Sequence, residues 1–346
     1  MNFKTNNKLK ILALFLLLFL ICLIALNIGP TSNTLKDTIK ILLAKLPVLG
    51  QYIDLGGIKE SQQTIILNIR LPRILLAALV GIALATTGAA FQGLLKNPMA
   101  DPYIIGISSG AALGAAIAIV SGLSLLIGFF ALPLMAFMGG LFSVLTVYNL
   151  ARVGNKVPIY NLLLSGVALS SFFSAVTSLL MILNSQEMSQ IVFWLLGSFS
   201  GRKWHHVQIA APLIIAGVVA LNFYARELNL MLFGESTAQS LGVNIEKVKK
   251  TLLVISSLTV ATAVAASGTI GFVGLIIPHG VRLVVGPDHR ILMPVAAITG
   301  GIFMVLTDTL ARTLMSPTEI PVGIITSIFG GPFFIYLLKQ KNIAKG

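Results

Sequence analysis

Apolar runs of about twenty residues recur along this chain, and they constrain its fold more than any other feature. A run of that length is long enough to cross ~30 Å of hydrocarbon as an α-helix. Only 10% of the residues are charged, against about 25% in soluble domains. The sequence therefore predicts an all-α polytopic membrane protein, with residues 1–346 forming a single transmembrane domain. Ten spans are predicted, at about 11–29, 71–92, 101–120, 126–150, 159–183, 205–225, 249–268, 271–285, 291–311 and 321–338.

An even number of spans places both termini on the same side of the membrane. If the N-terminus is inside, fifteen lysines and arginines fall on the cytoplasmic side and nine on the other. Such an excess marks the cytoplasmic side, so the sequence predicts an N-in, C-in topology in the cytoplasmic membrane. The formal net charge of +13 is then mainly a topology signal, and a nucleic-acid partner is not expected.

The beginning of the chain has two readings. Basic residues 1–10 precede the apolar run 11–28, as in a cleaved signal peptide, but no convincing small-x-small cleavage site follows. A retained first span is therefore favoured. The more polar segment 30–63 carries Leu35, Ile39, Leu42 and Leu46 at helical spacing. It fits an interfacial amphipathic helix on the outer side, or a surface helix packed on the protein.

A polar break divides the apolar stretch between residues 70 and 114. Lys96, Asn97 and Pro98 interrupt it, and such a break is tolerated only where it faces protein or water. Glycines on both sides allow helix backbones to approach closely. One interpretation is a constriction of a solute path, and the other is a turn that merely joins two helices. The residues assigned to this gate are Gln92, Asn97, Pro98 and Met99.

The stretch 226–250 is the longest polar insertion predicted on the inner side, yet it retains several apolar residues. A break at Gly234 precedes a short helical segment, and Gly242 ends it as a helix C-terminal glycine would. Apolar side chains on a protruding loop suggest a surface that docks into a partner; packing on its own bundle is the alternative. The residues assigned to docking are Leu230, Phe233, Gly234, Glu235, Ala238, Leu241 and Gly242.

Nucleotide chemistry requires another polypeptide, because no Gly-Lys pair occurs anywhere and a P-loop needs G-x-x-x-x-G-K-[ST]. On the predicted outer side, Arg70, Arg73 and Arg312 suit bidentate pairing with carboxylates of a partner protein. Membrane anchoring is the plainer reading, and Asp308, one turn before Arg312, could simply pair with it. If docking is correct, Arg73→Glu should weaken binding of the partner without harming folding.

Several long motifs resemble the permease subunit of ABC importers for vitamin B12, haem and ferric siderophores. They are RLPR, LVGIALATTGAAFQGLLKNPMADP, IGISSGAALGA, GESTAQSLGV, SGTIGFVGLIIPHGVRLVVGPDHR and PVGIITSIFGGPFF, in that order along nearly the whole chain.

The resemblance implies a homodimer with a separate cytoplasmic ATP-binding subunit and an extracytoplasmic binding protein. Residues 226–248 would couple to the ATPase, and Arg70, Arg73 and Arg312 would meet the binding protein. A ferric siderophore is the first expected substrate, followed by haem and cobalamin. No enzymatic activity of its own, no cofactor and no metal site are expected.

Other classes fit less well. An ion-coupled secondary transporter acting alone would need carboxylates deep in its spans, and Asp308 is the only clear candidate. An intramembrane enzyme would need a catalytic group, but no HExxH and no paired carboxylates occur. A weak echo relates residues 86–98 to residues 266–278. It indicates either an inverted repeat, as in many transporters, or chance similarity between Gly-rich segments.

Overall fold

The computed structural model describes residues 3–29, 34–47, 49–154 and 156–343, and within them the fold is entirely helical. Seven helices are long and apolar enough to cross a membrane, and three further apolar helices are shorter. The ten coincide with the ten predicted spans, which confirms that prediction. They are α1 (Phe3–Asn27), α4 (Leu71–Leu94), α5 (Ile107–Val120), α7 (Ala131–Ala151), α8 (Ile159–Leu183), α10 (Trp204–Phe223), α13 (Ile245–Ser267), α14 (Val273–Val285), α15 (His289–Ala311) and α16 (Val322–Ile343).

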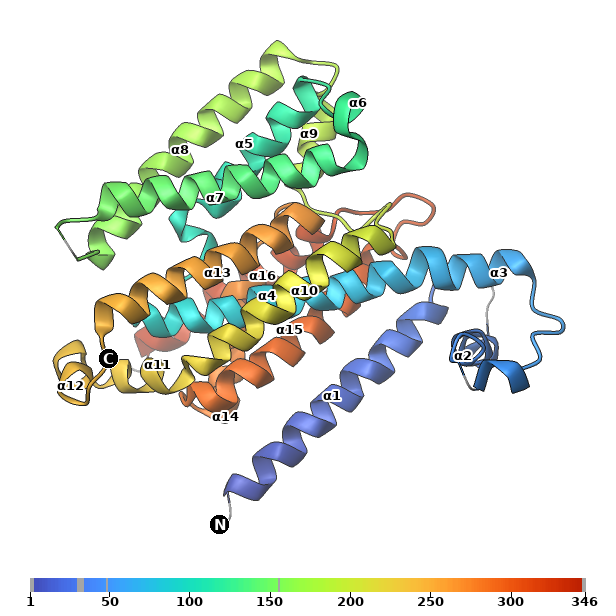
Figure 1. The fold of residues 1–346 in the computed structure, drawn as a ribbon, viewed down its shortest axis with the longest axis horizontal. Coiled ribbons are helices and arrows are strands. Elements are labelled where there is room, and N and C mark those ends of the chain that lie inside the picture. Colours follow the sequence, from blue (N-terminus) through green and yellow to red (C-terminus); the bar gives the residue numbers. More distant parts are fainter. Residues whose placement is uncertain (1–2, 30–33, 48, 155, 344–346) are drawn as a thin grey trace.

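Helix α4 lies at the centre of the main bundle, where it contacts α10, α13, α14 and α15 (Figure 1). Its glycines allow this packing, because a Cβ atom on Gly81 would lie 2.1 Å from the carbonyl oxygen of Gly300 in α15. Helices α5, α7 and α8 form a second group above it in Figure 1. There, Gly110 of α5 meets Gly139 of α7 in the same way. In lipid no hydrophobic driving force brings helices together, so they associate through close van der Waals packing, which small residues permit.

Short elements gather at the two ends of the bundle (Figure 1). At one end lie α2 (Leu35–Leu43), η1 (Leu49–Tyr52), α3 (Glu60–Thr64) and η2 (Ile65–Arg70). At the opposite end lie α11 (Ala225–Leu232) and α12 (Glu235–Ser240), on the same side as the start of α1 and the end of α16. The remaining connections are η3 (Pro102–Ile105), α6 (Ser124–Ile127), η4 (Gly128–Phe130) and α9 (Met188–Leu195).

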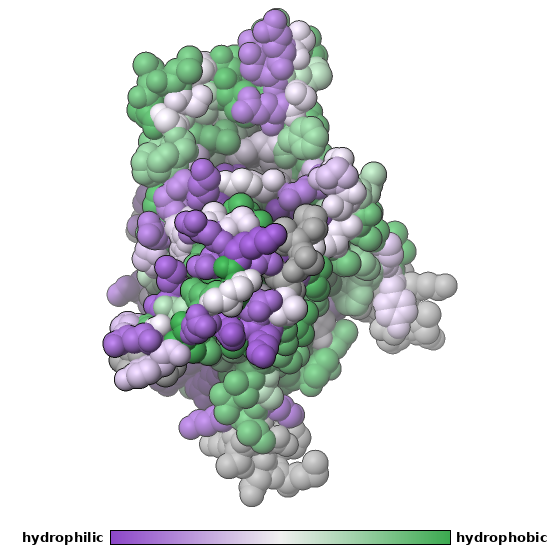
Figure 2. Space-filling model, turned by 90° about the vertical axis from the view of Figure 1, so that its right-hand side faces the viewer, coloured by the Kyte–Doolittle hydropathy of each residue, from purple (hydrophilic) through white to green (hydrophobic). Residues whose placement is uncertain are grey.

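Helix α2 has two distinct faces. Thr38 and Ile41 are buried, and the Thr38 hydroxyl donates to Asn27 Oδ1 of α1 at 2.7 Å. Leu35 and Ile39 are exposed on another face. The helix therefore packs on the protein along one face, and its exposed apolar residues remain available to a membrane interface. Figure 2 shows this end of the molecule, where hydrophilic residues gather at the middle and hydrophobic residues surround them.

Candidate functional site

The segment that carries Arg70 and Arg73 is a continuous helix with a π-helical insertion. The N–H of Leu71 donates to the carbonyl of Ile66, five residues earlier, in the π element η2. Pro72 follows at once, and a proline has no N–H to donate to an ordinary helical ladder. The wider turn lets the helix run from α3 through η2 into α4. π-Insertions of this kind occur often at functional sites.

Arg73 forms the central ion pair of this end of the bundle. Its Nε and Nη2 atoms donate to Asp308 of α15 at 3.0 and 2.8 Å, and its Nη1 donates to Glu319 at 2.8 Å. Asp308 is fully buried and Arg73 is 7% exposed. The alternative reading, that Asp308 simply pairs with Arg312, is therefore not supported, because the side chain that hydrogen-bonds to Asp308 is Arg73.

Arg70 and Arg312 donate hydrogen bonds to the end of α1. Arg70 Nη1 donates to the carbonyl oxygen of Leu26 at 2.7 Å, and Arg312 Nη2 donates to the carbonyl oxygen of Ala25. The last carbonyls of a helix have no partner within it, so these guanidinium groups supply one. All three arginines are buried in the single chain. They lie at the end of the bundle opposite to α11 and α12, and the docking role expected of them stays a prediction.

Glu319 is the more accessible partner of Arg73, with 35% of its side chain exposed. It lies in the connection between α15 and α16. Burial alone would raise the pKa of the Glu319 carboxyl, but the hydrogen bond and positive charge of Arg73 hold this pKa below its ordinary value. Its contribution to stability is thus fully present at neutral pH and is lost as the pH falls below about 4.

The four predicted gate residues have two different roles at the end of α4 and in the turn that follows it. Gln92 is buried, and its Nε2 donates to the carbonyl of Leu275 in α14 at 3.0 Å. Asn97 is exposed, and its Oδ1 accepts from the N–H of Met99 at 3.0 Å, which forms an Asx turn. Pro98 and Met99 are half-buried. Gln92 therefore fastens α4 to α14, while the other three residues form the turn itself.

A cavity of about 520 Å³ lies where α9, α16 and the break between α13 and α14 meet. The break is made by Gly268 and Phe272, whose φ angles are +75° and +70°. The N–H groups of Val322 and Gly323 donate to the carbonyls of Gly197 and Leu196, which joins α16 to the end of α9, and the Thr269 hydroxyl of the break donates to the carbonyl of Leu195. The contribution of α9 was not expected, because its sequence resembles any apolar helix. The cavity is lined by Leu195, Leu196, Thr269, Gly271, Gly323, Ile324, Ser327 and Ile328.

Residues 226–248 fold into two short helices joined at Gly234, whose φ of +116° marks the predicted break. The N–H groups of Gly242 and Val243 donate to the carbonyls of Gln239 and Ala238, which is a Schellman motif that ends α12. Gly242 is thus the C-terminal glycine that the sequence predicts.

The residues assigned to docking in this segment differ in exposure. Phe233 is 77% exposed and Leu241 is 59% exposed, whereas Ala238 is buried. Leu230 is half-buried against the bundle, so it and Ala238 hold the segment in place rather than present a surface. Glu235 pairs with Lys249 of α13 at 2.9 Å. Phe233 and Leu241 are therefore the most exposed apolar side chains of this set, and the Glu235 side chain is 39% exposed beside them.

A polar contact that the sequence did not reveal ties this segment to α15. Asn229 of α11 accepts from the backbone N–H of His289 at 2.8 Å, and its own side-chain N–H donates to Asp288 at 2.6 Å. His289 is buried at the start of α15. Helix α15 carries Asp308 near its other end. The same helix thus connects the inner segment with the buried ion pair of Arg73.

Known proteins resemble this chain over nearly its full length. Residues 16–340 match the model of the FecCD transport family. The cobalamin import system permease protein BtuC of Halobacterium salinarum is 48% identical over 287 residues, which cover 83% of this chain and 76% of that protein. The hemin transport system permease protein HmuU of Yersinia pestis is 38% identical over 353 residues, covering 100% of both chains.

A solved structure agrees with these relatives. It is an inward-facing ABC transporter assigned to the metal-chelate type, and it superposes with a TM-score of 0.81 at 34% identity. The match covers 95% of this chain and 98% of that one. The chain is thus a multi-pass membrane permease, and the ATPase of such a transporter is a separate subunit. It belongs to the FecCD transport family.

Proposed function

We propose that this permease imports a metal-bearing macrocycle of the corrin or porphyrin class, with cobalamin ahead of haem. Cobalamin is placed before haem because the chain is 48% identical to a cobalamin permease, and haem is included because the chain is similar to a hemin permease over its full length. The sequence alone ranked a ferric siderophore first. The ferric siderophore remains the alternative substrate, and the uptake experiment below includes it.

The cavity beside the break at Gly268 supports a large and weakly held solute. Its walls carry hydroxyl groups of Thr269 and Ser327, glycines and aliphatic side chains, and none of the residues that line it is charged. Tight ionic coordination would slow release on the inner side, whereas a wall of this kind allows a bulky solute to pass. We place the cavity as one half of a path that a second copy of the chain completes.

A binding protein would deliver the solute at the end that carries Arg73. Because Asp308 and Glu319 already satisfy its guanidinium group, an acidic residue of that partner can reach Arg73 only if Glu319 moves away. Asp308 is fully buried and would keep its contact. Docking through Arg73 would thus require a rearrangement of the α15–α16 connection, and docking through Arg70 or Arg312 would require these side chains to leave the carbonyl oxygens of α1.

At the opposite end, the ATP-binding subunit would dock on the exposed side chains of residues 226–248. Phe233→Asp should weaken the association with that subunit on the order of 30-fold, since an exposed aromatic anchor at an interface contributes about 2 kcal/mol or more. The measurement is the fraction of the ATPase that co-purifies with the permease. The matched control is Tyr52→Asp, an aromatic residue 81% exposed at the other end of the bundle. Equal loss in both variants would contradict docking at Phe233.

Uptake by proteoliposomes tests the proposed function as a whole. The permease, its ATPase and its binding protein would be reconstituted, and uptake of labelled cyanocobalamin, hemin and a ferric siderophore would be compared. ATP-dependent uptake of cobalamin or haem above the siderophore supports the proposal, and the reverse order overturns the substrate assignment. If the permease alone moved solute down an ion gradient, the secondary-transporter alternative would replace it.

A further inference from the structure

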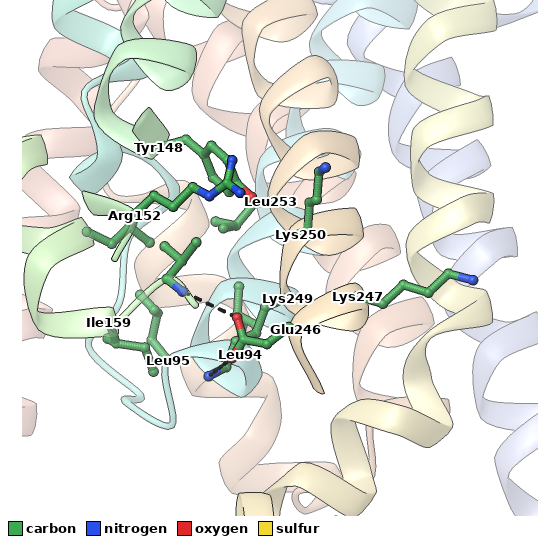
Figure 3. Close-up of a pocket in the computed structure, with 12 residues that line it drawn as sticks. Leu94, Leu95, Tyr148, Arg152, Ile159, Glu246, Lys247, Lys249, Lys250 and Leu253 are labelled. Atoms are coloured by element: carbon green, nitrogen blue, oxygen red, sulfur yellow. Dashed lines mark hydrogen bonds and ion pairs between the residues drawn. The ribbon is translucent and has the colours of Figure 1, made fainter. Parts of the chain in front are cut away.

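A basic pocket that the transport path does not use opens at the end of the bundle that carries α11 and α12. Its volume is about 300 Å³, and it lies between the α7–α8 connection and the first turns of α13 (Figure 3). The positive-inside rule places this end at the cytoplasmic surface of the membrane. Tyr148 and Arg152 form one side of it, and Lys250 and Leu253 form another (Figure 3).

Two of the charged groups in this pocket neutralise each other. Lys249 is buried and pairs with Glu246 at 3.6 Å, in addition to Glu235. Glu246 also accepts from the backbone N–H of Val157 at 3.3 Å. The acidic residue of the pocket is therefore committed to the protein and does not offset the remaining cations.

Arg152 and Lys250 also bring positive charge to this pocket, and the Nε of Arg152 donates to the carbonyl oxygen of Gly154 at 2.7 Å. Both residues are exposed, and in Figure 3 their charged ends point in the same general direction, on either side of Tyr148 and Leu253. Lys250 has no ion pair among the described residues. Lys247 contributes to the same pocket, but its ammonium group points away from Arg152 and Lys250 in Figure 3.

The wall beneath these cations is apolar. It consists of leucine and isoleucine side chains from three segments, namely Leu94, Leu95, Ile159, Leu162 and Leu253. The pocket lies where helices leave the membrane. Its cations suit the phosphate of a lipid headgroup, and its apolar lining suits the acyl chains joined to that headgroup.

We propose that this pocket binds the headgroup of an anionic phospholipid, with Arg152 and Lys250 holding the phosphate. A free phosphate compound would use the cations but would leave the apolar wall without a function. The two residues proposed to hold the phosphate lie outside the cavity and outside residues 226–248. The proposal can therefore fail while the proposed transport function holds, and the reverse is equally true.

Binding would be measured by native mass spectrometry of the delipidated full chain in neutral detergent, titrated with phosphatidylglycerol or phosphatidylcholine. The intact chain should retain phosphatidylglycerol in preference to phosphatidylcholine. The Arg152→Ala/Lys250→Ala variant should bind phosphatidylglycerol on the order of 30-fold more weakly, since each basic residue near a lipid surface contributes about 1 kcal/mol. Lys250→Gln alone, at an exposed position, keeps the test valid if the double variant folds poorly.

The matched control is Lys247→Ala, which removes one positive charge from the same turn of α13 without touching the proposed contact. Its affinity for phosphatidylglycerol should stay within about twofold of the intact chain, because only screened surface charge is lost. Equal weakening by Lys247→Ala and Lys250→Gln would overturn the site in favour of general surface charge. Displacement of the lipid by a tenfold excess of inorganic phosphate would overturn it in favour of a small-anion site.

Discussion

Replacing Asp308 with alanine is expected to destabilise the folded permease by about 3–5 kcal/mol, the usual cost of removing one partner from a buried ion pair. Asp308 is fully buried and accepts from two nitrogens of Arg73 at 3.0 and 2.8 Å. Without it, the guanidinium group would retain only Glu319, which is partly exposed. The measurement is the thermal unfolding transition of the purified chain in detergent.

The same contact changes the expected result of Arg73→Glu. The sequence predicted that this substitution weakens docking and leaves folding intact. In the structure it would place three carboxylates together in a buried position, so a low yield of folded protein is expected instead. A normal yield with normal thermal unfolding would show that Arg73 lies outside the buried pair.

Two variants separate the buried pair from its exposed neighbour. Glu319→Gln should cost less than about 1 kcal/mol, because a partly exposed ion pair contributes little. Arg73→Met combined with Asp308→Leu should recover most of the stability, since a buried pair can often be replaced by apolar side chains of similar size. If Asp308→Ala unfolded at the temperature of the unaltered chain, the pair would contribute nothing to stability.

The spans could be predicted from the sequence because the length of an apolar run is a local property. Even the short α14 was found, although His279 and Arg282 interrupt its apolar character. The break in residues 226–248 was also predictable. Gly234 and Gly242 adopt positive φ angles that few other residues tolerate, so their chemistry is visible without the rest of the fold.

Side-chain partners were beyond the sequence. Arg73 and Asp308 are 235 residues apart, and nothing local indicates that α4 and α15 place them together. The sequence instead offered Arg312, because it lies one turn from Asp308. The sequence also could not show which side chains of residues 226–248 are exposed. Phe233 and Leu230 are both apolar, and only the packing of α11 on the bundle decides which of them faces outward.

The echo between residues 86–98 and 266–278 acquires a physical meaning in the structure. Gly88 of α4 lies directly against Gly274 of α14, so the two similar segments pack on each other. Their local structures nevertheless differ, since α4 continues to Leu94 in the first copy while the second copy breaks between α13 and α14. The contact explains why both copies need small residues, whether or not they arose as an inverted repeat.

This contact carries the second large prediction. Gly88→Ala should cost about 3 kcal/mol, the upper end of the usual cost of overpacking, and reduce the yield of folded protein, because the fixed backbone opposite leaves no room to adjust. The new Cβ atom would lie 1.8 Å from the carbonyl oxygen of Gly274, and a backbone atom cannot move aside as a flexible side chain can. Thermal unfolding in detergent and the yield of monodisperse protein are the measurements.

Gly280→Ala is the matched control for this substitution. Gly280 lies within α14 itself, and a Cβ atom there would make only an ordinary contact with the Phe333 ring at 3.9 Å. Alanine is the better helix former by about 1 kcal/mol, so this variant should be as stable as the intact chain or slightly more so. The same chemical change would then have opposite effects at two helical glycines. Equal stability of Gly88→Ala and Gly280→Ala would mean that α4 and α14 do not meet at this point. Gln92, whose side chain donates to Leu275 in the next turn of the same contact, would then lose its role in fastening the hairpin to α14.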